Sequence, residues 1–301
     1  MNTHPRALSR AAFATLLLVA CMFGANHVAA RVAFNNGLDV ATAVTVRSLV
    51  TSAVVALLVL LQGVSRALSG RDVRVLLAVS ALVAIQSLCL YASVARLPVA
   101  LALLTFNTYP MWTAFFAWLI YRHRPERAVL IAIPLLLLGL ALALDVLGAA
   151  SGLGATGQWA RIGVGVAFAL VAASTFGVVL ALTQHEIAHV DGRLRTTVTM
   201  GVVGVLALLA VGAQGGFHWP QAAAGWWGLA LLTFFYGTAF TIMFTLLPRL
   251  GVVGGSPIMN VEPVAALILA WAVLDQAIAP LQLAGALLVV GTVMALGLRK
   301  R

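Results

Sequence analysis

The chain is a succession of long apolar stretches separated by short polar ones. A helix of roughly 17 to 25 apolar residues is long enough to cross the hydrocarbon core of a bilayer. Ten such stretches can be drawn, at residues 11–30, 40–63, 73–93, 98–121, 128–147, 162–184, 196–213, 225–247, 252–273 and 281–298. Each stretch predicts a transmembrane helix. A helix forms its backbone hydrogen bonds internally, and lipid offers the backbone no other hydrogen-bond partner. The longest loop, around 148–161, is rich in Gly, Ala and Ser and is expected to connect two halves.

Composition excludes a single soluble core. Of the 301 residues, 62% are hydrophobic and 9% are charged, against about 25% charged in soluble domains. The net charge of +10 comes from short basic clusters between apolar runs rather than from one polar face. A nucleic-acid partner is therefore not expected, whereas a lipid bilayer is.

The basic residues predict the orientation of the chain. If the N-terminus is cytoplasmic, fourteen of the 18 basic residues fall on the cytoplasmic side and Arg47 lies within a span. Only Arg31, Arg96 and Arg161 fall on the other side. By the positive-inside rule, both termini are expected in the cytoplasm. The first stretch resembles a secretory signal, but it has a counterpart in mid-chain and is expected to be a retained helix.

A shift of 153 residues brings the two halves into register. Phe23-Gly24 falls on Phe176-Gly177. In the fourth span the matches are Arg96-Leu97, Val99, Asn107, Pro110 and Ala117-Trp118, which fall on Arg249-Leu250, Val252, Asn260, Pro263 and Ala270-Trp271. A five-span unit enters the membrane from opposite sides in its two copies. The prediction is an all-α integral membrane protein of ten transmembrane helices in two inverted five-helix repeats, 1–150 and 151–301.

Several short motifs resemble those of a known family. They are Phe23-Gly24-Ala25-Asn26, Val46-Arg47-Ser48, the segment from Leu103-Leu104 to Tyr109-Pro110, and Val261-Glu262-Pro263. Together they are similar to the EamA-type ten-helix branch of the drug/metabolite transporter (DMT) superfamily. Ser48 stands where the family typically has an aromatic residue, and the family's Gly-Glu pair is missing after the fourth and ninth spans. The resemblance implies an exporter of small metabolites in the bacterial inner membrane, with amino acids prominent among the substrates.

Two charged residues lie at membrane depth, where each costs about 2.5 to 3.5 kcal/mol on insertion scales. Glu262 is near the middle of its span and Arg47 about seven residues from the outer end of its own. Glu262 is either a proton-coupling carboxylate or cation partner, or a structural acid. Arg47 either binds a substrate carboxylate or forms a fixed structural pair. A direct pair between the two is compatible with the sequence but not required.

The fourth span carries Thr105, Tyr109, Trp112 and Phe116 at the spacing of one helical face. This stripe either lines an aromatic pocket or packs against other helices. Tyr109 is the repeat partner of Glu262, so the two are expected to face each other across the central axis.

Prolines mark places where these helices are expected to be irregular. Asn107 and Asn260 lie beside Pro110 and Pro263, and each amide either repairs the helix or contacts substrate. Gly254-Gly255-Ser256-Pro257 permits close helix approach or local unwinding, as at transporter gates. The other polar residues that could reach a cavity are Asn26, His27, Gln86, Ser174 and Tyr236.

No motif for an enzyme, a cofactor or a metal is evident. His185 and His189 lack a third ligand, and Cys21 and Cys89 lie within apolar runs. The function expected is secondary active transport of a small molecule, without a cofactor. Two alternatives stay open: an intramembrane enzyme acting on lipid or isoprenoid substrates, and a passive small-solute channel. A homodimer also stays open, because spacings such as Gly201 to Gly204 pack helices within or between chains.

Overall fold

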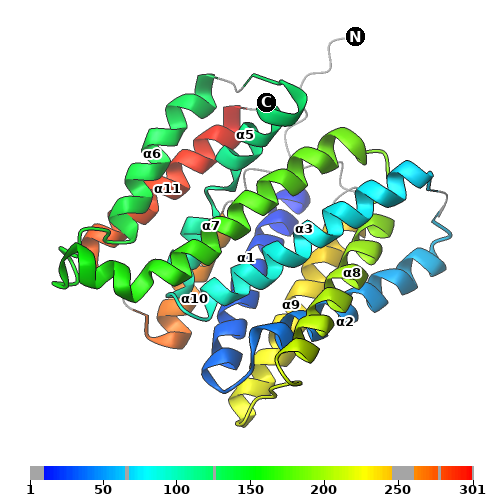
Figure 1. The fold of residues 1–301 in the computed structure, drawn as a ribbon, viewed down its shortest axis with the longest axis horizontal. Helices are drawn as coiled ribbons and strands as arrows, with labels where there is room; N and C mark the ends of the chain where they lie inside the picture. Colours follow the sequence, from blue (N-terminus) through cyan, green and yellow to red (C-terminus); the bar gives the residue numbers. More distant parts are fainter. Residues whose placement is uncertain (1–9, 65–67, 125–126, 246–260, 277–278, 300–301) are drawn as a thin grey trace.

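The computed structural model describes residues 10–64, 68–124, 127–245, 261–276 and 279–299. These residues form eleven helices and no strand (Figure 1). The helices are α1 Arg10–Asn35, α2 Val40–Leu61, α3 Gly70–Val94, α4 Val99–Phe106, α5 Tyr109–Tyr121, α6 Arg127–Ala143, α7 Gly154–Glu186, α8 Gly192–Ala213, α9 Ala223–Thr245, α10 Glu262–Leu274 and α11 Pro280–Arg299.

Each of the ten predicted stretches contains at least one helix. By length and composition, seven helical segments of the described chain could cross a membrane when α4 and α5 are taken together. Three apolar helices, α6, α10 and the described part of α11, are shorter. The predicted connection 148–161 is wrong in extent, because α7 already begins at Gly154. Part of the ninth stretch, 252–260, lies outside the described residues.

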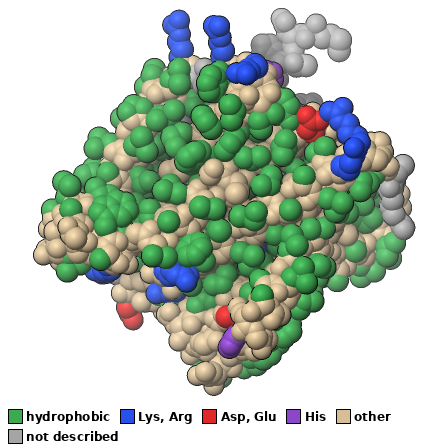
Figure 2. Space-filling model, viewed as in Figure 1, with side chains coloured by type: hydrophobic (Ala, Val, Ile, Leu, Met, Phe, Trp, Pro, Cys, Tyr) green, Lys and Arg blue, Asp and Glu red, His purple; other side chains and the backbone are tan. Residues whose placement is uncertain are grey.

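The surface is that of a protein surrounded by lipid. Figure 2 shows hydrophobic side chains over the broad middle of one face, with charged side chains gathered toward its margins. Large apolar side chains on several helices are more than half exposed, among them Leu61, Ile131, Leu209, Trp227 and Leu287. Hydrocarbon chains are as apolar as leucine, so helices in a bilayer associate through close packing rather than through hydrophobic burial.

The helices pack in pairs drawn from the two halves of the chain. The main pairs are α2 with α8, α1 with α9, α3 with α7, and α6 with α11. Helix α1 also packs on α10, and α7 packs on both α4 and α5. Elements far apart in the sequence therefore lie side by side (Figure 1).

Glycines allow the closest of these contacts. A Cβ atom at Gly24 of α1 would lie 2.9 Å from the backbone nitrogen of Ala266 in α10. A Cβ atom at Gly177 of α7 would lie 2.8 Å from the backbone nitrogen of Thr113 in α5. Any larger residue would have to push the backbone of the neighbouring helix away. Gly24 thus sets how closely α1 and α10 approach each other, and Gly177 does the same for α7 and α5.

The α2–α8 pair is tied at both ends by capping residues. Asp39 and Asp191 are the N-caps, and Gln62 and Gln214 are the C-caps. The Gln214 side-chain amide donates to Asp39 Oδ1 at 2.8 Å, and Arg193 bridges Asp191 and Gln62 at the other end. Partial burial raises the pKa of Asp39, but hydrogen bonds from Thr42, Gln214 and His218 outweigh that effect and hold the pKa below its ordinary value.

Helices α5 and α10 are built alike. Each has 13 residues, carries a proline in its first turn, and ends at a non-glycine residue in the left-handed conformation. These last residues are Arg122 and Asp275, with φ of 59° and 52°. The starts, Tyr109 and Glu262, are 153 residues apart, as are the ends. The caps of α2 and α8, in contrast, are 152 residues apart, so the register shifts by one residue there.

Candidate functional site

Arg47 lies in the interior of the helix bundle, with 2% of its surface exposed. Its guanidinium carbon sits 4.4 Å from the ring centroid of Tyr91 on α3 and 3.9 Å from that of Tyr236 on α9. Both distances are in the range of cation–π attraction. No carboxylate of the described chain lies within ion-pair distance of Arg47. The aromatic rings, rather than an acid, therefore stabilise its charge.

Tyr91 links this arginine to α1. Its side chain is fully buried, and its hydroxyl donates a hydrogen bond to Asn26 Oδ1 at 2.7 Å. The rings of His27 and Phe34 lie 5.6 and 5.9 Å from the Tyr91 ring. Tyr91 carries no charge and lies outside the repeated motifs in a mostly apolar segment, so nothing in the sequence singled it out.

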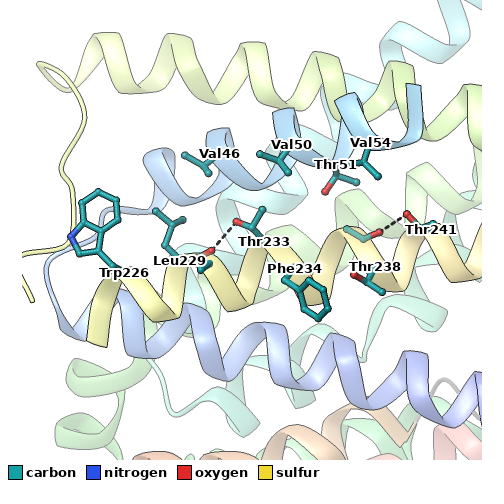
Figure 3. Close-up of a pocket in the computed structure, with 12 residues that line it drawn as sticks. Val46, Val50, Thr51, Val54, Trp226, Leu229, Thr233, Phe234, Thr238 and Thr241 are labelled. Atoms are coloured by element: carbon teal, nitrogen blue, oxygen red, sulfur yellow. Dashed lines mark hydrogen bonds between the residues drawn. The ribbon is translucent and has the colours of Figure 1, made fainter. Parts of the chain in front are cut away.

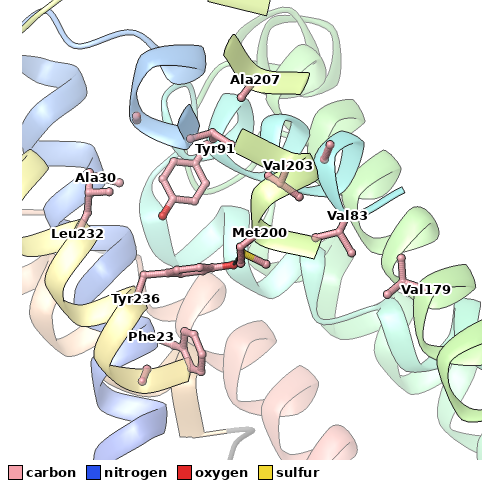
Figure 4. Packing of buried hydrophobic residues seen from close by; sticks show 14 of the residues in the cluster. Phe23, Ala30, Val83, Tyr91, Val179, Met200, Val203, Ala207, Leu232 and Tyr236 are labelled. Carbon is pink, nitrogen blue, oxygen red and sulfur yellow. Dashed lines mark hydrogen bonds between the residues drawn. The ribbon is translucent and has the colours of Figure 1, made fainter. Parts of the chain in front are cut away.

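Tyr236 provides the second ring beside the Arg47 guanidinium. Figure 4 shows Tyr236 between Phe23 and Met200, with Tyr91 nearby. The Tyr236 hydroxyl lies 3.6 Å from Met200 Sδ, and the Phe23 ring meets the Tyr236 ring edge-on at 6.0 Å. Packing on several sides holds Tyr236 in place beneath Arg47.

Glu262 pairs with His27. Glu262 Oε1 lies 3.5 Å from His27 Nε2, and the two side chains are 24% and 6% exposed. Glu262 is the first residue of α10, where the helix dipole favours a negative charge. The close contact at Gly24, one turn before His27 on α1, brings the two helices near enough for this pair.

Tyr109 belongs to an aromatic group next to this pair. Its ring lies 5.6 Å from that of Phe106 and 5.2 Å from that of Phe176. The rings of Phe106 and Phe176 also lie 5.4 Å apart, so Tyr109 packs in a group of three aromatic side chains from α4, α5 and α7.

The predicted stripe on the fourth span is interrupted. Helix α4 ends at Phe106 and α5 begins at Tyr109, so Thr105 is not on one continuous face with Trp112 and Phe116. Thr105 is buried and donates to the Leu101 carbonyl instead. Trp112 stacks on Phe116 at 6.4 Å, and its indole nitrogen is buried without a hydrogen-bond partner in the described chain.

The break at Asn107 is bridged by side chains. The Asn107 amide donates to the Leu103 carbonyl at 2.8 Å, and the Thr108 hydroxyl donates to the Thr105 carbonyl at 2.9 Å. Pro110 and Pro263 lie in the first turns of α5 and α10, so they start helices rather than bend them. Four predicted residues lie outside the described chain: Asn260, Gly254, Gly255 and Pro257.

Two other polar predictions fall outside this cluster. Gln86 is buried on α3, where its side-chain oxygen accepts from the Ser87 hydroxyl at 3.3 Å. His185 lies 3.1 Å from His123, and His189 lies 3.1 Å from Asp72. Across the described residues, no three His, Cys, Asp or Glu side chains gather as metal ligands would.

Two hollows lie near the Arg47 cluster. One, of about 600 Å³, runs between α2 and α9 and is lined mostly by apolar side chains (Figure 3). The other, of about 550 Å³, lies between the α1–α2 connection and the end of α3. Phe34 lines the second hollow and also packs edge-on against Tyr91. Phe34 therefore connects the lining of this hollow to Tyr91 of the Arg47 cluster.

Comparison with known proteins identifies the family. A model of the EamA-like transporter family matches the chain twice, at residues 10–144 and 163–298. The chain belongs to the EamA-like transporter family. It is therefore a multi-pass membrane transporter of the DMT superfamily. A search of curated proteins found no match.

The EamA-like fold also appears among solved structures. One crystal structure, described only as "Crystal structure of protein", shares 17% sequence identity and superposes with a TM-score of 0.63. The match covers 97% of this chain and 100% of the other. At this identity the likeness concerns the fold alone.

Proposed function

We propose that this EamA-like protein is a secondary active transporter that exports small metabolites such as amino acids by alternating access. The observation that carries the proposal is a cluster where α1, α2, α3 and α10 meet. It consists of the buried residues Arg47, Asn26, His27 and Tyr91 and the partly buried Glu262. Charged and polar groups at membrane depth are costly and mark substrate or ion pathways. We place substrate and coupling proton in this cluster, with Tyr236 as part of its wall.

The architecture proposed is ten transmembrane helices in two inverted five-helix repeats, 1–150 and 151–301. The likeness of α5 and α10 supports it. So do the paired glycine contacts, because Gly24 meets Ala265 and Ala266, and Gly177 meets Trp112 and Thr113. Each residue of the first contact lies 153 positions from its counterpart in the second.

The helix pairs support the same symmetry. Exchanging each helix for its repeat counterpart turns the α1–α9 pair into α7–α3, and α1–α10 into α7–α5. The pairs α2–α8 and α6–α11 map onto themselves. Within the α2–α8 pair, the contact of Gly201 with Ser52 is the counterpart of that of Gly204 with Leu49 at the 152-residue shift. A pseudo-twofold axis in the membrane plane is the arrangement expected of inverted repeats.

The central site departs from this symmetry, and the departure suggests separate roles. Glu262 has Tyr109 as its counterpart, and Arg47 has Thr199 at the α2–α8 shift. The proton is assigned to the Glu262–His27 pair, since a carboxylate and an imidazole 3.5 Å apart can exchange a proton with modest rearrangement. The orientation proposed is the one in which both termini face the cytoplasm of a bacterial inner membrane.

Uptake into proteoliposomes tests this function. The purified protein is screened with amino acids, amines and small drugs under imposed pH gradients. We expect saturable uptake that depends on the gradient, together with counterflow of preloaded substrate. Glu262→Gln should abolish gradient-driven uptake while leaving counterflow. Asp275→Asn, which neutralises an exposed acid at the end of α10, is the matched control and should retain gradient-driven uptake.

The outcomes separate the alternatives. If the pH-dependent flux is unchanged in Glu262→Gln, Glu262 does not carry the coupling proton. Flux without saturation or counterflow indicates a passive channel instead of a transporter. Chemical conversion of an added lipid or isoprenoid substrate would indicate an intramembrane enzyme.

A further inference from the structure

Several buried polar atoms around Arg47 have no hydrogen-bond partner in the described chain. They include Arg47 Nε, Arg47 Nη2 and Asn26 Nδ2. All three are donors, and they belong to side chains that are 2% and 0% exposed. Buried donors normally have partners, because an unsatisfied one costs about 1 to 3 kcal/mol. This group of donors points to a ligand that accepts hydrogen bonds.

The positions of the two arginine atoms narrow the chemistry. Nε and Nη2 lie on the same edge of the guanidinium, and together they form the fork that binds a carboxylate through two parallel hydrogen bonds. The guanidinium carbon lies over the rings of Tyr91 and Tyr236. The N–H bonds of Nε and Nη2 lie in the guanidinium plane, so a ligand that accepts from both approaches in that plane.

Asn26 adds a third unpartnered donor, on a residue that Tyr91 links to Arg47. The Tyr91 hydroxyl donates to Asn26 Oδ1, which assigns the unpartnered atom as the amide nitrogen. Tyr91 packs against Arg47 and Asn26 alike, so the two sets of donors flank the same ring.

Arg47 is a buried cation without a counter-ion among the described residues. Arg47 has no carboxylate within ion-pair distance in the described chain, and the one acid nearby, Glu262, pairs with His27. A buried cation without a counter-ion favours an anion of equal and opposite charge. One positive charge matches a monocarboxylate better than a phosphate dianion.

We propose that Arg47 binds the carboxylate of the transported molecule side-on through Nε and Nη2, with Asn26 Nδ2 as an additional donor. The inference rests on the proposed transport function and specifies its substrate class as small monocarboxylates, amino acids included. Tyr91 and Tyr236 act as positioning residues that hold the guanidinium plane. The rest of the substrate lies toward Glu262, where a substrate amine would meet a negative charge.

Binding measurements on the purified protein in nanodiscs test this proposal. The probes share one carbon skeleton: leucine, leucinamide and 4-methylpentanoate. We expect leucine and 4-methylpentanoate to bind at least tenfold more tightly than leucinamide, which lacks the carboxylate. A preference of leucine over 4-methylpentanoate would assign the substrate as an amino acid, and equal binding would assign a simple carboxylate.

Substitutions test whether Arg47 and Asn26 bind the carboxylate. Arg47→Lys keeps the charge but removes the fork, and should weaken carboxylate binding at least tenfold. Arg195→Lys is the matched control, because Arg195 of α8 is also partly buried but donates to the Ile187 carbonyl and lines neither hollow. Asn26→Asp keeps the acceptor for Tyr91 and adds a negative charge, so it should weaken binding of 4-methylpentanoate and spare that of leucinamide.

The proposal is overturned if leucinamide binds as tightly as leucine, or if neither carboxylate of the series binds. So does unchanged carboxylate binding in both Arg47→Lys and Asn26→Asp. Gradient-driven uptake of substrates without a carboxylate would leave the transport function standing while refuting this inference. Carboxylate binding at Arg47 without any uptake would refute the transport function instead.

Discussion

Arg47 shows how one side chain can be both costly and stable in a membrane. Inserting an arginine into a bilayer costs about 2.5 to 3.5 kcal/mol on insertion scales. A desolvated cation–π contact returns about 2 kcal/mol, and Arg47 makes two, with Tyr91 and Tyr236. The rings can therefore offset the charge, while Nε and Nη2 have no hydrogen-bond partner in the described chain.

Tyr91 is expected to contribute through its ring more than through its hydroxyl. Tyr91→Phe keeps the ring under Arg47 and removes the hydrogen bond to Asn26, so it should lower the free energy of unfolding by about 1 kcal/mol. Tyr91→Leu removes the ring as well and should cost clearly more. Thermal unfolding in the same detergent measures both. Equal losses in the two variants would contradict a stabilising role for the ring.

Asp39 should make stability depend on pH. Its pKa is lowered in the folded protein, so its contribution is complete above the ordinary pKa near 3.8 and is lost as the pH falls through the lowered value. Asp39→Asn should therefore lower the unfolding temperature at neutral pH, with a difference that shrinks below about pH 4. Unfolding temperatures across the pH range check this. A difference that persists in acid would point to the shape of the side chain rather than to its charge.

At the scale of helices, close approach depends on single glycines. Gly177 lies on the face of α7 that meets α5, where an added Cβ atom would be 2.6 Å from Trp112 Cβ. Gly177→Ala should lower the free energy of unfolding by about 1 to 3 kcal/mol, because neither backbone can move without disturbing the packing. Gly163→Ala, on the same helix, meets its nearest atom at 3.6 Å and is the matched control. Chemical or thermal unfolding that is equal for the two variants would contradict the close contact.

Hydropathy predicted where the helices lie better than how they begin and end. Each apolar stretch holds a helix because lipid requires it, whatever the packing. The division of the fourth span at Asn107 was signalled by Pro110, yet its form depends on hydrogen bonds to Leu103 and Thr105. The early start of α7 at Gly154 carried no such signal, since the Gly-rich segment 148–161 reads as a loop.

The candidate site was predictable only in part, for a physical reason. Arg47 and Glu262 stand out because charge is rare at membrane depth. Tyr91 and His27 become important through tertiary contacts, with Arg47 and Glu262 respectively. A neutral tyrosine or a single histidine gives no sign in the sequence of which helix it will meet.

At the scale of the whole molecule, the two ends of the bundle differ. At the end proposed as cytoplasmic, α3 and α5 are joined to α7 through Glu186, which pairs with Arg71 and accepts from the Tyr121 hydroxyl at 2.9 Å. The Tyr121 ring stacks on His185 at 4.0 Å. At the opposite end, Phe34 lines a hollow and its ring packs against Tyr91. The proposed cytoplasmic end is therefore held by the network around Glu186, and the opposite end has this hollow beside the contact of Asp39 with Gln214.

Alternating access requires the contacts of Glu186 to break and re-form during each cycle. Exposed ion pairs contribute about 0 to 1 kcal/mol each, and the Arg71 side chain is 74% exposed, so the pair alone is a weak closure. Tyr121 adds a hydrogen bond to Glu186 and stacks its ring on the adjacent His185, so the closure is a network rather than a single ion pair. Glu186→Gln should loosen that network without unfolding the bundle. Hydrogen exchange of the last turns of α5 and α7 should become faster, while exchange in the first turn of α2 stays unchanged.

The same variant links this end of the molecule to transport. If opening there limits turnover, Glu186→Gln will raise the rate of counterflow while keeping gradient-driven uptake. Asp145→Asn, which removes a charge from the connection between α6 and α7, is the control and should alter neither exchange at this end nor counterflow. Unchanged hydrogen exchange in Glu186→Gln would show that the contacts of Glu186 do not hold the two halves together. The closure would then rest on apolar packing of α3 against α7 and α8, and Glu186 would have no part in the transport cycle.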